Sequence, residues 1–165
     1  FPDSKANVRF MPNLAVALGK SPNVLAAREL EAADKANVTE LAEMLGTAEW
    51  LQDESLFDLA TALAGSGPGF VYRFIDALGS AANELGLPEP MARRLALAMV
   101  DGAGTLAAVS DFSPGELADR VASPGGMTRQ GLNVLDQDKS LESLVLKTLK
   151  ATAERGAELS KSAGK

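Results

Sequence analysis

The stretch Gly65-Ser66-Gly67-Pro68-Gly69-Phe70 (GSGPGF) begins like a glycine-rich loop that holds nucleotide phosphates. A dinucleotide fingerprint needs a strand before its glycines, a third glycine three residues after the second, and an acidic residue about 20 residues further on. Here Phe70 stands at the third-glycine position, and residues 55–64 have helical spacing. Pro68 is typical of a first helical turn, so we interpret GSGPGF as a turn that begins a helix, with amides that could line a site.

The sequence after this turn predicts a series of helices, over residues 70–85, 90–109, 114–122, 127–136 and 139–159. The second is apolar almost all round, which predicts that protein covers it and that the chain is an obligate oligomer. Gly102 and Gly104 each cost roughly 1 kcal/mol relative to alanine in a helix, so we expect another helix to approach closely there. Ser113 and Glu116 around Pro114 predict a capping box.

Before the turn, the pattern changes to that of an α/β layer. We expect strands in the segments NVRFMPN, NVLAAR and TAEWLQDE and a helix over residues 31–46. Gly46 is predicted to end that helix, and Trp50 to anchor the last strand.

The composition narrows the chemistry that this chain can perform. There are 16 basic and 22 acidic residues, for a net charge of -6, so binding to nucleic acid or to an anionic membrane is not expected. The absence of cysteine and histidine excludes thiolates, disulfides and imidazole acid-base catalysis, and no metal site is predicted. The apolar runs are too short to span a membrane and no signal peptide is visible, which predicts a cytoplasmic protein.

A second glycine segment, SPGGMT, begins at Ser123. Its proline ends one helix, its glycines allow positive φ, and a new helix follows at once. Free amides of Gly125, Gly126, Met127 and Thr128, together with the helix dipole, predict a small anion nest that suits a carboxylate. Ser123 and Thr128 add hydroxyl groups at its two rims. The alternative is an ordinary turn between helices, capped by Thr128.

Three segments together resemble pyrroline-5-carboxylate reductase: VRFMPN, ALAGSGPGFVYRFIDAL and LADRVASPGGMTRQGLNVLD. Their order and spacing fit that family from Asn7 to Leu159. The resemblance implies a mainly α fold, with a helical substrate and dimerisation domain of the 6-phosphogluconate-dehydrogenase-like type at residues 55–165. Residues 1–54 would be the last part of a Rossmann cofactor domain, and the dinucleotide fingerprint is expected upstream of Phe1.

The same resemblance implies hydride transfer from NADPH or NADH to the C=N bond of 1-pyrroline-5-carboxylate, which gives L-proline in the last step of proline biosynthesis. A protonated imine needs little acid catalysis, which suits a chain without histidine or cysteine. The Thr128 hydroxyl would face the ring nitrogen as the catalytic group. The residues implied to bind the substrate are Thr61, Asp111, Ser123, Gly125, Gly126, Met127 and Thr128, and those implied to lie beside the nicotinamide are Met11, Pro12 and Asn13.

Some positions depart from the family pattern. Asp111 stands where many relatives have glutamate, Leu14 where threonine is usual, Gly69-Phe70 where Ala-Tyr is common, and Met127 where a small residue is usual. The change at Met127 could alter the shape of the pocket, although its backbone amide is retained.

The resemblance also implies a homodimer, with a decamer of five dimers as a further form. The chain alone is expected to be inactive, and its residues do not choose between NADPH and NADH. One rival interpretation is another reductase with a Rossmann and a helical domain, such as a hydroxyacid dehydrogenase. Such enzymes usually depend on a lysine, whereas Lys139, Lys147 and Lys150 are interpreted as solvated. The other rival is a non-catalytic dimerisation module.

Overall fold

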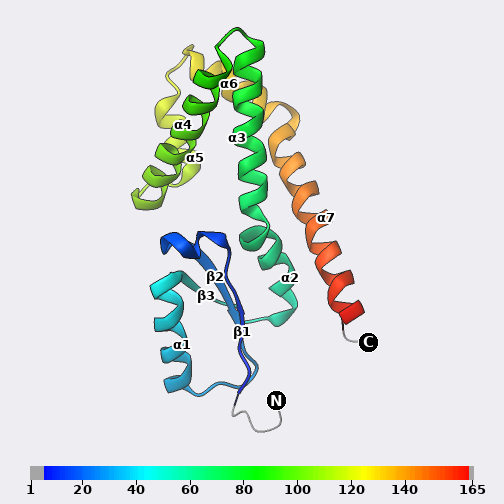
Figure 1. The fold of residues 1–165 in the computed structure, drawn as a ribbon. Coiled ribbons are helices and arrows are strands. Elements are labelled where there is room, and N and C mark those ends of the chain that lie inside the picture. Colours follow the sequence, from blue (N-terminus) through cyan, green and yellow to red (C-terminus); the bar gives the residue numbers. More distant parts are fainter. Residues whose placement is uncertain (1–5, 164–165) are drawn as a thin grey trace. The chain divides into compact units, whose positions relative to one another are not determined.

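A computed structural model describes residues 6–163, which form a mainly helical chain with one small sheet (Figure 1). The chain divides into two compact units. The first unit contains residues 6–68 and 147–163 and holds the sheet, whereas the second unit, residues 69–146, is entirely helical. The predicted fold class, a helical domain preceded by a partial α/β portion, is confirmed. The domain division predicted at residue 54 stays a prediction.

The sheet has three strands in the order β1-β2-β3, namely β1 Arg9–Met11, β2 Ser21–Ala26 and β3 Gly46–Trp50. β1 pairs antiparallel with β2, and β3 pairs parallel with it, so that Leu25 lies opposite both Phe10 and Trp50. β2 is the central strand and forms the core, because Val24, Leu25 and Ala26 are buried. The predicted order of strand, strand, helix and strand is confirmed.

Helix α1, Ala32–Leu45, joins β2 to β3 and is held to the sheet by two side chains. The fully buried Asn23 donates from Nδ2 to the carbonyl oxygens of Ala42 and Thr47, each at 2.8 Å, and so ties the end of the helix to the start of β3. Trp50 donates from Nε1 to Oγ1 of Thr39 at 2.8 Å. The predicted role of Trp50 as an anchor is therefore confirmed.

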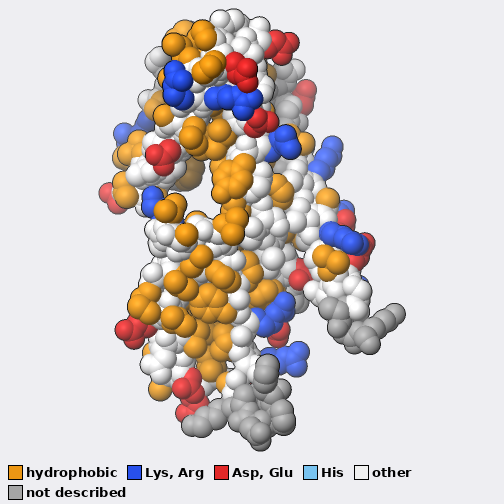
Figure 2. Space-filling model, in the orientation of Figure 1, with side chains coloured by type: hydrophobic (Ala, Val, Ile, Leu, Met, Phe, Trp, Pro, Cys, Tyr) orange, Lys and Arg blue, Asp and Glu red, His pale blue; other side chains and the backbone are white. Residues whose placement is uncertain are grey.

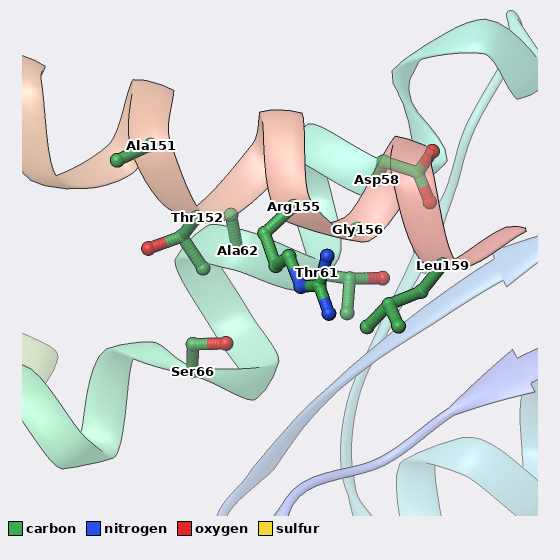
Figure 3. A pocket seen from close by; sticks show the side chains of 9 residues that line it. All are labelled: Asp58, Thr61, Ala62, Ser66, Ala151, Thr152, Arg155, Gly156 and Leu159. Carbon is green, nitrogen blue, oxygen red and sulfur yellow. The ribbon is translucent and has the colours of Figure 1, made fainter.

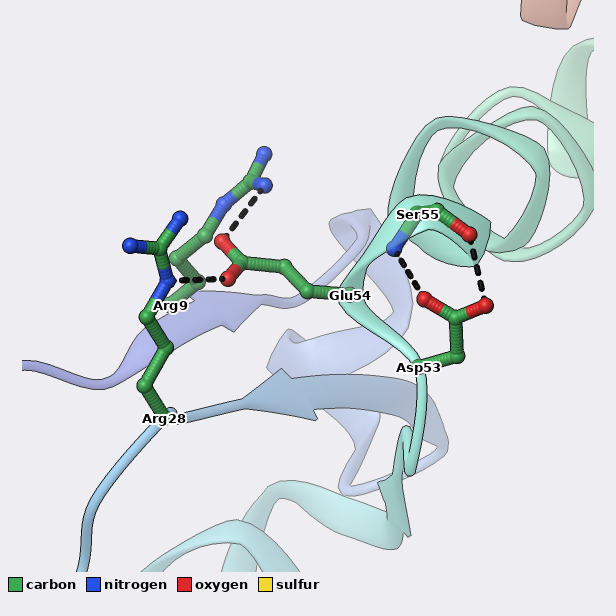
Figure 4. Close-up of polar contacts among 5 residues, drawn as sticks. All are labelled: Arg9, Arg28, Asp53, Glu54 and Ser55. Atoms are coloured by element: carbon green, nitrogen blue, oxygen red, sulfur yellow. Dashed lines mark hydrogen bonds and ion pairs between the residues drawn. The ribbon is translucent and has the colours of Figure 1, made fainter.

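Glu54 joins the strand ends to the helices that follow (Figure 4). Its Oε1 accepts from Nη1 of Arg9 at 3.2 Å, and its Oε2 accepts from Nε of Arg28 at 3.3 Å. These hydrogen bonds, the one from Arg9 first, hold the pKa of Glu54 below its ordinary value. The Arg9 guanidinium also lies 3.6 Å from the centre of the Phe57 ring, so the end of β1 packs on the first helical turns.

Four helical elements follow β3 almost without interruption: the 3₁₀ turn η2 Glu54–Leu56, α2 Phe57–Ala60, the π-helical turn η3 Thr61–Gly65, and α3 Gly67–Glu84. The prediction that a helix begins at GSGPGF is confirmed, because α3 starts at Gly67, directly after the π turn and Ser66. The amide of Ser66 donates to the carbonyl of Thr61, five residues back, at 3.1 Å. Gly65 therefore closes a π turn, and the start of α3 is not a free helix N-terminus.

The remaining helices are α4 Glu89–Val109, α5 Pro114–Val121, α6 Met127–Asp136, the short η4 Gln137–Lys139 and α7 Ser140–Ala163. They confirm the predicted helical series. The capping box is also present, because Ser113 Oγ accepts from the Glu116 amide at 3.3 Å and the Glu116 carboxylate accepts from the Ser113 amide at 2.8 Å. Hydrogen bonds from Ser113 keep the pKa of Glu116 below its ordinary value.

Helices α3 and α4 pack closely through small residues. Ala92 and Ala96 are buried, and a Cβ added at Gly79 would lie 3.5 Å from Cα of Arg93. The large apolar side chains of α4 are exposed in the single chain, namely Leu95, Leu97, Met99, Leu106 and Val109. Figure 2 shows such hydrophobic side chains on the molecular surface. A Cβ at Gly102 or Gly104 would meet nothing within 4 Å among the described residues, so the helix expected there is not supplied by this part of the chain.

We predict that Gly46→Ala strongly destabilises the first unit. Gly46 has a φ of 150°, and an added Cβ would overlap backbone atoms of Ser21. The expected loss in free energy of unfolding is roughly 3 kcal/mol or more, measured by chemical denaturation. Gly19→Ala is the matched control, because Gly19 also has positive φ, at 63°, but open space around it. Gly19→Ala should lower the free energy of unfolding by only about 1–2 kcal/mol. Equal losses for the two variants would show that the positive φ, and not the close approach of Ser21 to Gly46, causes the destabilisation.

Candidate functional site

The segment predicted to lie beside the nicotinamide begins at Met11, the last residue of β1, in the first unit. Asn13 is its most connected residue, and both its backbone and its side chain are engaged in hydrogen bonds. Its amide donates to Oγ of the buried Ser21 at 2.9 Å, its Oδ1 accepts from the Ala15 amide at 2.8 Å, and its Nδ2 donates to the Ala64 carbonyl at 2.9 Å. The structure thus holds Asn13 in one orientation. Its contact with a cofactor stays a prediction.

Met11 brings the same segment against the π turn. Its sulfur lies 3.1 Å from the position that a Cβ on Gly65 would occupy, and Cγ2 of Thr61 lies 3.4 Å from that position. Met11 also packs on the core cluster formed by Val24, Ala26 and Phe57. The first unit therefore brings together two predicted cofactor-side residues, Met11 and Asn13, and one predicted substrate-side residue, Thr61.

Thr61 also lines a cavity of about 490 Å³ within the first unit (Figure 3). The helical stretch after β3 and the second half of α7 form its walls, and the lining residues are Asp58, Thr61, Ala62, Ser66, Ala151, Thr152, Arg155, Gly156 and Leu159. The Oγ1 atom of Thr61 is buried and has no hydrogen-bond partner among the described residues. This hydroxyl is therefore a polar group that a neighbour or a ligand could satisfy.

The contribution of α7 to this cavity was not predicted from the sequence. Gly156 lies close to Asp58, because a Cβ added at Gly156 would be 3.6 Å from Cβ of Asp58. Arg155 pairs with Glu158, its Nη1 lying 2.8 Å from Oε2. The small residues on the apolar side of α7 were the available signal, since they allow another segment to approach closely.

The SPGGMT turn lies in the second unit, between α5 and α6. Gly125 has a φ of 72°, as predicted, whereas Gly126 has an ordinary φ of -75°. The prediction of four free amides is wrong at one position, because the Gly126 amide donates to the Ser123 carbonyl at 2.9 Å. The amides of Met127 and Thr128 occupy the first turn of α6, where a helix offers no internal acceptor. They leave a small donor site beside two exposed hydroxyls.

An ion pair closes this turn. Nη2 of Arg129 in α6 lies 2.7 Å from Oδ1 of Asp119 in α5, and the Arg129 side chain is only 30% exposed. The turn between Ser123 and Thr128 is thus held at both ends by residues of its flanking helices. Asp111 lies exposed in the connection between α4 and α5 of the same unit. The binding roles of these residues, like those in the first unit, stay predictions.

The remaining candidates offer no competing chemistry. Lys139 and Lys150 are exposed and lie 3.8 Å from Glu142 and Glu154, and Lys147 is exposed as well, which agrees with their interpretation as solvated residues. Within residues 6–163, no cluster of three or more acidic side chains could hold a metal ion. In the same range, no helix is both long and apolar enough to cross a membrane.

Comparisons with known proteins agree on one family. A family model described as pyrroline-5-carboxylate reductase dimerisation matches residues 54–159. The pyrroline-5-carboxylate reductase of Pisum sativum is 35% identical over 93% of this chain and 56% of its own length. A solved pyrroline-5-carboxylate reductase from Coxiella burnetii has a TM-score of 0.88 at 32% identity, over 93% of this chain and 57% of that one.

The Plasmodium falciparum pyrroline carboxylate reductase, solved with NADP bound, has a TM-score of 0.79 at 28% identity, over 93% of this chain and 62% of that one. In each of these three comparisons the matched region covers less than two thirds of the relative.

We predict that Asp119→Asn loosens the SPGGMT turn without unfolding the protein. Amide hydrogen exchange over residues 125–128 should become several-fold faster, while the free energy of unfolding falls by less than about 1 kcal/mol, as for other exposed ion pairs. The control is Asp76→Asn, which removes the exposed partner of Arg73 within α3. If both variants leave exchange in the turn unchanged, the Arg129–Asp119 pair does not hold it.

Proposed function

The chain belongs to the pyrroline-5-carboxylate reductase family, and we propose that the protein carrying it reduces the C=N bond of 1-pyrroline-5-carboxylate to L-proline with NADPH or NADH. The observation that carries this proposal is the turn from Ser123 to Thr128. In an acidic chain, it presents backbone amides of a helix N-terminus and two hydroxyl groups at one point. It lies inside the region that the family model matches.

In this proposal the turn binds the substrate carboxylate. The amides of Met127 and Thr128 donate to the carboxylate oxygens, and the Ser123 hydroxyl adds a third donor. The Gly126 amide is not part of this set, because it holds the turn closed through Ser123. The carboxylate thereby fixes how the ring lies, which is the main contribution the protein makes to a hydride transfer.

The Thr128 hydroxyl is proposed to face the ring nitrogen. Thr128 stands next to the amides that take the carboxylate, and the carboxylate carbon is bonded to the carbon beside that nitrogen in the substrate. A hydroxyl can donate to a neutral imine or accept from a protonated one, so Thr128 can orient the C=N bond in either form. Asp111 and Thr61 are proposed to complete the substrate side in the assembled enzyme.

On the cofactor side, the residues present fit the nicotinamide end. Met11 is packed on Gly65, Asn13 is held by hydrogen bonds of its backbone and side chain, and Pro12 is exposed between them, so the segment offers a fixed surface to a planar ring. A bound nicotinamide would supply the hydride. The glycines of GSGPGF lie in helical turns, which does not match the loop of a dinucleotide fingerprint. The NADP-bound relative favours NADPH, and NADH remains the alternative.

We further propose that the functional unit is a homodimer built on the second unit. Its exposed apolar side chains and the open space at Gly102 and Gly104 are what a second copy would cover. The family model that matches this region is described as a dimerisation domain. Residues 1–54 are then the last part of the cofactor domain and residues 55–165 the substrate and dimerisation domain. A decamer and a cytoplasmic location stay predictions.

We predict that the complete protein oxidises NADPH only when 1-pyrroline-5-carboxylate is present, as followed by the absorbance of the reduced nicotinamide. Thr128→Ala should lower kcat by roughly ten- to a hundredfold, because one oriented hydrogen bond at the reacting nitrogen is lost. Thr128→Ser keeps the hydroxyl and should retain most of the activity. Unchanged kinetics for the alanine variant would remove Thr128 from the mechanism, and an inactive wild type would refute the proposed function.

We predict that Leu97→Lys dissociates the dimer. The Leu97 side chain is 58% exposed on the apolar surface of α4, and a charge there would have to be buried in the interface. The molar mass from light scattering at low micromolar concentration should fall toward that of a monomer. Ser80→Lys, which adds the same charge on the polar side of α3, should leave the mass unchanged. A monomeric wild type would contradict the proposed dimer.

A further inference from the structure

The carbonyl of Ala64 accepts a hydrogen bond from a residue far away in the sequence. In a regular α-helix this carbonyl would accept from the amide of residue 68. That residue is Pro68, which has no amide hydrogen and whose ring crowds the carbonyl four residues back. Nδ2 of Asn13 donates to it instead, at 2.9 Å. The carboxamide of Asn13 therefore replaces a helix hydrogen bond that the sequence of α3 cannot make.

The helix distortion at this point has a defined register. The Ser66 amide bonds five residues back to Thr61 at 3.1 Å, and residues Thr61–Gly65 form one π turn. Return to a regular α-helix would shift the bonding by one residue and rotate the side chains of the turn around the helix axis by about 100° per residue. The Thr61 side chain, whose hydroxyl is now buried and has no partner among the described residues, would then point in another direction. The direction of Thr61 thus depends on the π turn.

We propose that Asn13 is a positioning residue, which fixes the π turn through Ala64 and so couples the cofactor-side segment to the substrate-side residue Thr61. Two features support this role. Asn13 is itself held by Ser21 and Ala15, so it can transmit its position to the turn. Met11 provides a second contact with the turn at Gly65. The cofactor role of the segment that contains Asn13 and the substrate role of Thr61 rest on the proposed function. The coupling between these two parts is a property of the fold.

The substitution that isolates the donor is Asn13→Asp. The new carboxylate can still accept from the Ala15 amide, but it cannot donate to the Ala64 carbonyl. In the complete protein, we expect amide exchange in the peptide covering residues 61–66 to increase roughly tenfold, as expected for one lost hydrogen bond. We expect kcat/KM for the imine substrate to fall by a similar factor, with a smaller change in the KM for NADPH. If Asn13→Asp does not fold, Asn13→Ser makes the same test, because serine is too short to reach Ala64.

The matched control is Asn83→Asp. Asn83 also donates from Nδ2 to a backbone carbonyl, that of Leu87 at 2.8 Å, but at the other end of α3. It should change neither the exchange of residues 61–66 nor the kinetics. Equal effects of the two variants would mean that Asn13 has only a general stabilising role and would overturn the proposal.

A second-site variant tests the chemical reason directly. Pro68→Ala supplies the missing amide hydrogen. In that background, the effects of Asn13→Asp on amide exchange in residues 61–66 and on kcat/KM should be at least halved. Strictly additive effects would overturn the proposal. If the wild type shows no reductase activity, the proposed function is refuted. The hydrogen-exchange data still test the coupling between Asn13 and the π turn in that case.

Discussion

The missing amide hydrogen of Pro68 is the constraint around which the first unit is organised. It leaves the Ala64 carbonyl without its normal helical donor, and the loop after β1 supplies one through Asn13. That bond requires the loop to lie against the helical stretch, which in turn brings Met11 onto Gly65 and the core. The proline, the π turn, the end of β1 and the loop that follows it therefore meet at this point.

The two units differ in how they obtain stability. In the first unit, β2 is buried between two neighbouring strands, and Nδ2 of the buried Asn23 donates two hydrogen bonds inside it. In the second unit, the buried positions of α4 are occupied by Ala92 and Ala96, and its larger apolar side chains face outward. Burying such side chains stabilises a fold by roughly 1.5–3 kcal/mol each. These exposed side chains contribute little hydrophobic stabilisation to the single chain, and the proposed dimer would bury them.

The strands, the helices and their order could be predicted from the sequence, because periodicity and capping residues are local signals. Ser113 with Glu116, and Gly46 after α1, were read from a few neighbouring residues and are confirmed. The π turn could not be predicted in this way, because its register depends on a bond between Asn13 and Ala64, which are 51 residues apart. The engaged amide of Gly126 was missed for a related reason: composition shows that a turn forms, but not which of its donors it uses internally.

The contribution of α7 to the cavity beside Thr61 is a tertiary property as well. It arises because Gly156 lets the helix approach Asp58, and nothing near Thr61 in the sequence indicates it. The binding roles of Thr128, Ser123 and Asp111 came from the family resemblance, whereas the shape of their turn came from its glycines and proline. Local chemistry was therefore sufficient to predict that a turn forms there, but not which of its amides remain free.

The ion pair between Arg129 and Asp119 has a consequence for ligand affinity. It fixes the two helices that flank the SPGGMT turn before any ligand is present, and the Gly126 amide fixes the turn itself. The conformational entropy of these residues is lost during folding, and binding of an anion does not have to order them again. A preorganised turn of this kind can bind a small carboxylate with a few hydrogen bonds, because binding causes little further loss of backbone conformational entropy.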